Sequence, residues 1–263
     1  MSRARRAAVT MAVAAVVAAG CTSPRRGSEV PVAGPGSASA QAPGLYVAVG
    51  ASETVGEGTD NPLREAWPQV LFRTALAPSV AFVNLGVSGA TVADALAIEV
   101  PRAERLDPTL VTVWLNVNDL IGGVPASAYQ RSLAVVVHRL RATGATVLVA
   151  NTPPLDHLPV YLACLDPAQR GDRCPPSVPD PLPPPTTVDA DVDAYNAATA
   201  QVAAAEGAVL VDLHAAGLAA RAQGREAGLF SGDGFHPNAA GAQAVAEAFA
   251  AALPAGRRAG GAA

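Results

Sequence analysis

The sequence predicts an open α/β sandwich built around a parallel sheet. Five short apolar runs, rich in Val and Leu and bounded by turn residues, are typical of strands buried on both faces. Segments with helical periodicity separate these runs, and 50% of the 263 residues are apolar, which is enough for one sizeable core. Such alternation implies right-handed crossovers and places the functional site beyond the carboxyl ends of the strands.

The individual elements follow from these patterns in chain order. The expected strands comprise residues 45–49, 80–85, 110–115, 146–150 and 208–212. Trp67-Pro68 is typical of a helix start, and this helix is expected to end near Leu76. Two more helices are predicted by apolar faces, which pass through Tyr129, Leu133, Val136 and Leu140 and through Val188, Val192, Tyr195 and Val202. Pro237 suits the first position of a last helix, whose apolar face passes through Ala242, Val245, Phe249 and Leu253.

Residues 1–21 have the features of an export signal. Three arginines precede an apolar stretch that is too short to span a bilayer. The stretch ends in Ala-Ala-Gly-Cys, which resembles the lipobox of bacterial lipoproteins and implies lipidation of Cys21. An ordinary secretory signal is the alternative. We therefore expect an exported protein of the bacterial envelope, either secreted or held at the cell surface by a lipid anchor on Cys21.

The rest of the chain divides by composition. Residues 22–43 are mostly Ser, Gly, Pro and Ala and are expected to form a flexible tether, and residues 44–254 are expected to form one monomeric domain. Residues 255–263 are expected to be a disordered tail. The net charge of −4 and the absence of lysine give no electrostatic footprint for nucleic acid.

One segment, residues 152–187, has many prolines and no sustained period. It follows the fourth expected strand, so it is expected either to cover the site or to be a surface insertion. Cys164 and Cys174 lie close together within it, and in an exported protein a disulfide is favoured over two free thiols. Metal binding is the lesser interpretation because no second pair of ligands stands nearby.

Asp233 and His236 form the most informative pattern in the chain. Pro237 follows His236 and keeps this residue out of the helical region, so His236 is expected on a loop. Asp233 can there accept the Nδ1 proton of His236 and leave Nε2 free to act as a base. The alternative is that Asp233 caps the following helix and His236 is an ordinary surface histidine.

A nucleophile and oxyanion donors are expected where earlier strands end. Ser52 comes directly after the first strand and a glycine, in Gly50-Ala51-Ser52, where the turning backbone can present its hydroxyl group. Gly86 and Asn118 follow the second and third strands. Acyl transfer produces a negatively charged oxygen, and the backbone N–H of Gly86 and the side-chain NH₂ of Asn118 are suitable donors to it.

With these segments in this order, the chain resembles the SGNH hydrolases, also called the GDSL lipase and esterase family. The resemblance covers nearly the whole expected domain. It implies a three-layer α/β/α sandwich with a five-stranded, flavodoxin-like parallel sheet. It assigns the nucleophile to Ser52, the acid and base to Asp233 and His236, and the oxyanion hole to Ser52, Gly86 and Asn118.

The chain departs from the family pattern at three positions. Ala51 and Glu53 replace the Asp and Leu of Gly-Asp-Ser-Leu, and Asn116 stands where a glycine usually precedes the third block. Asp119 is expected to hold that loop through backbone hydrogen bonds. The resemblance implies a serine esterase or lipase that needs no cofactor and no metal.

Other interpretations keep the same fold. An acyltransferase acting on a glycan of the cell envelope would use the same nucleophile and base, and a non-catalytic surface lipoprotein would only bind a partner. A metal site formed by His214, which follows Asp212 after the fifth strand, together with Asp233 and His236 is a lesser alternative. The expected substrate is a small-molecule, lipid or glycan ester whose acyl group the sequence does not specify.

Overall fold

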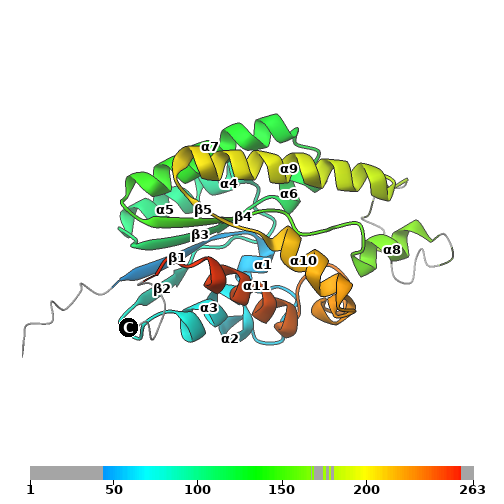
Figure 1. Cartoon of the computed structure of the whole chain (residues 1–263), viewed down its shortest axis with the longest axis horizontal. Helices are drawn as coiled ribbons and strands as arrows, with labels where there is room; N and C mark the ends of the chain where they lie inside the picture. Colours follow the sequence, from blue (N-terminus) through cyan, green and yellow to red (C-terminus); the bar gives the residue numbers. More distant parts are fainter. Residues whose placement is uncertain (1–43, 167, 169–173, 176–177, 179–180, 256–263) are drawn as a thin grey trace, which may run out of the picture. The chain divides into compact units, whose positions relative to one another are not determined.

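Five parallel strands form one sheet in the order β2-β1-β3-β4-β5. The computed structural model describes residues 44–166, 168, 174–175, 178 and 181–255 (Figure 1). The strands are β1 (Leu45–Gly50), β2 (Ala81–Asn84), β3 (Leu110–Trp114), β4 (Thr146–Ala150) and β5 (Val209–Val211). Each lies within two residues of its expected range. The predicted α/β sandwich with a five-stranded parallel sheet is therefore confirmed.

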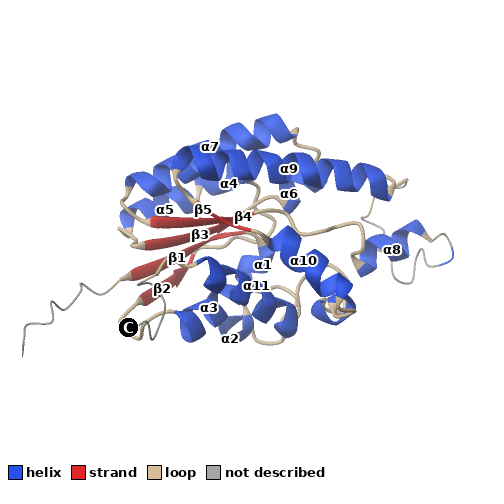
Figure 2. Ribbon diagram, viewed as in Figure 1, coloured by secondary structure: helices blue, strands red, loops and turns tan. Residues whose placement is uncertain are grey.

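Helices cover both faces of this sheet (Figure 2). One face carries α4 (Val92–Ala97), α5 (Glu99–Arg105), α7 (Ala126–Ala142) and α9 (Pro185–Glu206). The other carries α3 (Trp67–Ala75), α10 (Leu213–Ala222) and α11 (Ala239–Ala252). The shorter helices are α1 (Ser52–Val55), α2 (Pro62–Glu65), α6 (Val117–Ile121), α8 (Pro159–Leu165) and the 3₁₀ helix η2 (Glu226–Leu229).

The strands separate two apolar cores because successive side chains point to opposite faces. In β1, Val47 and Val49 belong to the core that includes residues of α5, α7 and α9, whereas Tyr46 and Ala48 belong to the core that includes residues of α3 and α11. All four side chains are fully buried. This two-sided burial explains why β1 appears in the sequence as a continuous apolar run.

The last helix begins two residues later than the sequence predicts. Pro237 pairs with Phe230 in an isolated β-bridge, and Asn238 caps α11 by accepting hydrogen bonds from the N–H groups of Ala240 and Gly241. The cap is therefore Asn238. The alternative role of Asp233 as the helix cap is wrong for this structure.

Residues 152–187 are partly helical, contrary to the expectation of an irregular segment. They include α8 and the first turn of α9. Cys164 in α8 forms the predicted disulfide with Cys174, and the Tyr161 hydroxyl donates to the Pro183 carbonyl at 2.7 Å. Leu155, Leu158 and Tyr161 also join an apolar cluster with α9, so the segment packs onto the domain.

The expected export signal, the lipidation site Cys21 and the tether at 22–43 lie outside the described residues, as do residues 256–263 of the expected tail. None of the helices in the described part of the chain is long and apolar enough to cross a bilayer.

A buried carboxyl group lies directly beneath the end of β1. Glu99 is 0% exposed, and its Oε2 atom accepts the N–H of Gly50 at 2.8 Å. Burial raises the pKa of Glu99 to about 8, and the Gly50 hydrogen bond opposes this rise only in part. The group therefore favours its neutral form in the folded protein.

This raised pKa links folding stability to pH. Because the folded state binds the Glu99 proton more tightly than the unfolded state, the stabilisation is complete below the ordinary glutamate range and is lost as pH rises towards 8. We expect Glu99→Gln to remove this loss, so the variant gains on wild type by about 1.4 kcal/mol per pH unit in that window. Urea unfolding at pH 5 and pH 8 measures the difference, with the exposed Glu247→Gln as control. Parallel pH dependence of wild type and Glu99→Gln would contradict the assignment.

Candidate active site

The candidate site lies where the sheet order reverses. The chain passes from β1 to β2 on one side and returns to β3 on the other, so the loops after β1 and β3 diverge at this point. Ser52 follows β1, the loop 85–91 follows β2, and Asn118 lies in α6 after β3. The structure thus brings all three predicted segments to one edge.

Ser52 begins the one-turn helix α1 and is 5% exposed. A side chain at Gly50 would place its Cβ atom 2.8 Å from the Trp114 carbonyl oxygen, so glycine lets the chain turn tightly against β3 before Ser52. The N–H of Ser52 lies in the first turn and has no intrahelical acceptor. It has no hydrogen-bond partner among the described residues and is free to bind an oxyanion.

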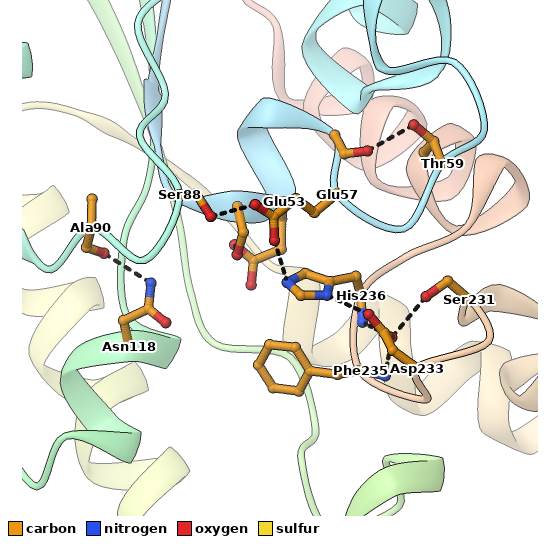
Figure 3. A network of polar contacts seen from close by, with 12 residues as sticks. Glu53, Glu57, Thr59, Ser88, Ala90, Asn118, Ser231, Asp233, Phe235 and His236 are labelled. Atoms are coloured by element: carbon orange, nitrogen blue, oxygen red, sulfur yellow. Dashed lines mark hydrogen bonds and ion pairs between the residues drawn. The ribbon is translucent and has the colours of Figure 1, made fainter. Parts of the chain in front are cut away.

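Asp233 and His236 form the predicted pair. His236 Nδ1 lies 2.6 Å from Asp233 Oδ2, and Asp233 Oδ1 accepts the N–H groups of Phe235 and His236 and the Ser231 hydroxyl (Figure 3). Burial alone would raise the pKa of Asp233, but these hydrogen bonds outweigh it and lower the pKa to about 2. Asp233 therefore stays ionised at neutral pH and fixes both the ring and its loop.

The other ring nitrogen of His236 faces a carboxylate that the sequence analysis did not identify. Nε2 lies 3.4 Å from Glu57 Oε2, and the other Glu57 oxygen accepts the Ser88 hydroxyl (Figure 3). Gly56 adopts a φ of 100° and turns the chain after α1, which brings Glu57 back to His236. In the sequence, Gly56 and Gly58 on either side of Glu57 were the only sign of a turn at this position.

Ser52 and His236 are not hydrogen-bonded to each other in this structure. The Ser52 hydroxyl lies 3.5 Å from Glu53 Oε2 instead. Desolvation raises the pKa of this half-buried carboxyl, while the nearby His236 and the Ser52 hydrogen bond act in the opposite direction. A direct bond between Ser52 and His236 requires a side-chain rearrangement, and catalytic hydrogen bonds often tighten only in the substrate complex.

The expected oxyanion donors differ in availability. Gly86 donates its N–H to Asn84 Oδ1 at 2.9 Å, so this amide is already used. Asn118 Nδ2 donates to the Ala90 carbonyl at 3.0 Å, which leaves its second proton free. Gly89, next to Ala90, is exposed with a φ of 75°, and no described residue accepts its N–H.

The sequence does contain a sign that Gly89 lies at the tip of a loop, namely the capping box that follows it. Thr91 and Asp94 satisfy each other's backbone N–H groups at the start of α4. The loop between β2 and α4 therefore ends at Thr91, and Ser88-Gly89 forms its tip. Asp119 of α6 holds the start of α4, because its Oδ2 accepts the Val92 N–H at 2.9 Å. From the sequence, a backbone hydrogen bond of Asp119 was expected within its own loop after the third strand.

The metal alternative gains no support from the geometry. In the described part of the chain, no group of three or more His, Cys, Asp or Glu side chains is arranged to hold a metal ion. The backbone N–H of His214 donates to Asn151, and Asp212 accepts the N–H of Ala215 as the cap of α10.

The chain is similar to known proteins both in sequence pattern and in structure. The pattern of the GDSL-like Lipase/Acylhydrolase family matches residues 48–244. No curated protein sequence matches significantly.

Three solved structures share the fold. The structure of TesA is 24% identical, with a TM-score of 0.58, and the match covers 80% of this chain and 97% of that one. Phospholipase A1 from Streptomyces albidoflavus NA297 is 20% identical, with a TM-score of 0.59 and coverage of 81% and 100%. The psychrotrophic esterase EstA from Pseudoalteromonas sp. is 17% identical, with a TM-score of 0.55 and coverage of 80% and 96%.

The Asp233 contact yields a test of the pair. We expect Asp233→Asn to lower kcat by about 10²- to 10⁴-fold, because the amide no longer stabilises a charged His236 or its tautomer. Ser231→Ala, which removes only one neutral donor to the same carboxylate, is the matched control and should cost less than about tenfold. Steady-state kinetics on a p-nitrophenyl ester measures both. Equal losses in the two variants would show that Asp233 only shapes the loop.

Proposed function

We propose that this chain, which belongs to the GDSL-like lipase/acylhydrolase family, is a serine esterase that acts through Ser52, His236 and Asp233. The observation that carries the proposal is the bond of 2.6 Å between His236 Nδ1 and an ionised Asp233, at the same sheet edge as Ser52. A pair held in this way orients Nε2 as a general base.

In the proposed reaction, the Ser52 hydroxyl attacks the acyl carbonyl while its proton passes to His236 Nε2. The tetrahedral intermediate collapses, the alcohol leaves with that proton, and an acyl-enzyme remains. Water then attacks the acyl-enzyme, gives a proton to Nε2 and releases the acid, and the proton returns to Ser52. Ester and water are the only reactants, so the reaction needs no cofactor.

We assign the oxyanion to the Ser52 N–H, the free proton of Asn118 and the Gly89 N–H. Gly89 replaces the Gly86 donor of the sequence analysis, because the Gly86 N–H is bound to Asn84. The Ala90 carbonyl, one residue from Gly89, is held by Asn118, which places the two proposed donors beside each other. Donors that are already oriented stabilise developing charge without reorganisation.

Glu57 competes with Ser52 for His236 Nε2. In the proposed cycle, substrate binding displaces the Glu57 carboxylate from the ring. Its side chain is 43% exposed, so it can turn into solvent at small cost.

Hydrolysis of p-nitrophenyl acetate tests the nucleophile. We expect Ser52→Ala to lower kcat by at least about 10³-fold, since the covalent step is lost. Ser88→Ala, on the neighbouring loop at the same edge, is the control and should keep activity within about tenfold. A folded Ser52→Ala variant with wild-type activity would overturn the proposal.

We also propose that the enzyme is exported and that Cys21 is lipidated. The disulfide between Cys164 and Cys174 supports export, because such bonds persist mainly in oxidising compartments. In a bacterial host, the full chain should incorporate labelled palmitate into the membrane fraction, and Cys21→Ser should abolish the label. Equal labelling of the two chains would contradict lipidation at Cys21.

A further inference from the structure

A cavity of about 360 Å³ begins at the candidate site. Glu53, Val117 and Phe235 line one end of it, and each is the direct sequence neighbour of a proposed catalytic or oxyanion residue. Phe235 also packs edge-on against His236, with ring centroids 4.9 Å apart. Ser52, Asn118 and His236 do not line the cavity themselves, but Glu53 contacts the Ser52 hydroxyl and Phe235 contacts the His236 ring, so the cavity adjoins the reacting centre.

From the site, the cavity extends between α10 and α11. Small residues form its two helical walls, namely Ala216, Ala219 and Ala220 on α10 and Gly241, Ala244 and Ala248 on α11. The volume lies in the range of small-molecule sites, and it arises because these side chains do not fill the space between the helices.

The remaining wall consists of the loop after β4 and of η2, and contacts with α10 hold both in position. Pro153 and Pro154 leave β4 at the cavity, and a Cβ atom on Gly217 would lie 2.5 Å from Pro154 Cδ, so α10 packs closely on this loop. Arg221 of α10 binds Asp156 at 2.9 Å and Glu226 of η2 at 2.8 Å. These ion pairs tie the loop and η2 to the same helix, so the cavity is preformed.

The lining selects for hydrocarbon. Among the described residues that line the cavity, there is no hydroxyl or amide side chain, and four are charged, namely Glu53, Arg225, Glu226 and Glu247. A sugar or another polyhydroxylated group would leave its hydroxyl groups without partners there, which is costly. An alkyl chain needs no partners and gains free energy on leaving water.

The direction of proton transfer indicates whether the acyl group or the alcohol of the ester enters the cavity. The leaving alcohol takes its proton from His236 Nε2, which faces the partly exposed Glu57 carboxylate, and this carboxylate in turn accepts the hydroxyl of the exposed Ser88. Neither Glu57 nor Ser88 lines the cavity. The alcohol can thus depart on the exposed side beside Glu57, which leaves the cavity beyond Glu53 and Phe235 for the acyl chain.

We propose that the cavity between α10 and α11 binds the acyl chain of a linear alkanoate ester, an inference that rests on the proposed esterase function. The substrate class is then esters of medium-length fatty acids, and short acyl groups leave the cavity unfilled.

Chain-length selectivity tests the cavity. With p-nitrophenyl acetate, butyrate, hexanoate and octanoate, kcat/KM of the wild type should rise by about fourfold for each methylene that enters the cavity.

Ala244→Phe fills the cavity from α11 and should lower the octanoate-to-acetate ratio of kcat/KM by about tenfold or more, since the burial of two methylenes is lost. Ala219→Phe, on the opposite wall, should do the same, and because Ala219 is exposed we expect this variant to fold. Ala222→Phe is the matched control, because Ala222 is exposed on α10 outside the cavity and its variant should keep the wild-type ratio.

The outcomes separate this inference from the proposed function. Ser52-dependent hydrolysis with no preference for longer chains, or wild-type ratios in both filled variants, overturns the cavity assignment and leaves the esterase standing. Selectivity for chain length in the alcohol of alkyl acetates, and not in the acyl group, also overturns it. No Ser52-dependent hydrolysis of any of these esters overturns both proposals.

Discussion

The candidate site depends on one constraint, the parallel alignment of all five strands. Parallel strands deliver their carboxyl ends to the same edge, so loops separated by more than a hundred residues meet there. The reversal of strand order between β1 and β3 separates neighbouring loops and leaves room for Ser52 and Asn118. The helices on both faces exist to bury the strands, and the short α1 and α6 turn directly out of the sheet at this edge.

Three carboxyl groups lie near the candidate base and a fourth lies beneath the end of β1, and their environments give them different tasks. Asp233 accepts four hydrogen bonds and is held ionised. Glu53 contacts the Ser52 hydroxyl and Glu99 accepts the Gly50 N–H, and in both desolvation favours the neutral form. Glu57 is more exposed and contacts Nε2. The same functional group thus orients the ring, supports the loop under Ser52 and competes for the base.

Much of this arrangement is visible in the sequence because burial imposes periodicity. The strands were predictable from apolar runs, and Ser52, Asp233 and His236 from their positions relative to strands and to Pro237. The start of the last helix was predicted less well. The helix begins at Ala239, after the Asn238 cap, and not at Pro237. Contacts made through tertiary folding escaped prediction. Glu57 reaches His236 only because Gly56 reverses the chain, and the Gly86 N–H is taken by an asparagine side chain two residues away.

The central claim is that Ser52 is the group that forms a covalent bond with the acyl substrate. Peptide mapping by mass spectrometry after incubation with p-nitrophenyl diethyl phosphate tests this directly, because an activated serine attacks the phosphorus and keeps the diethylphosphoryl group. The account predicts a single adduct on the peptide that contains Ser52, formed far more slowly in His236→Ala. An enzyme that hydrolyses esters but carries its adduct elsewhere, or carries none, would contradict it.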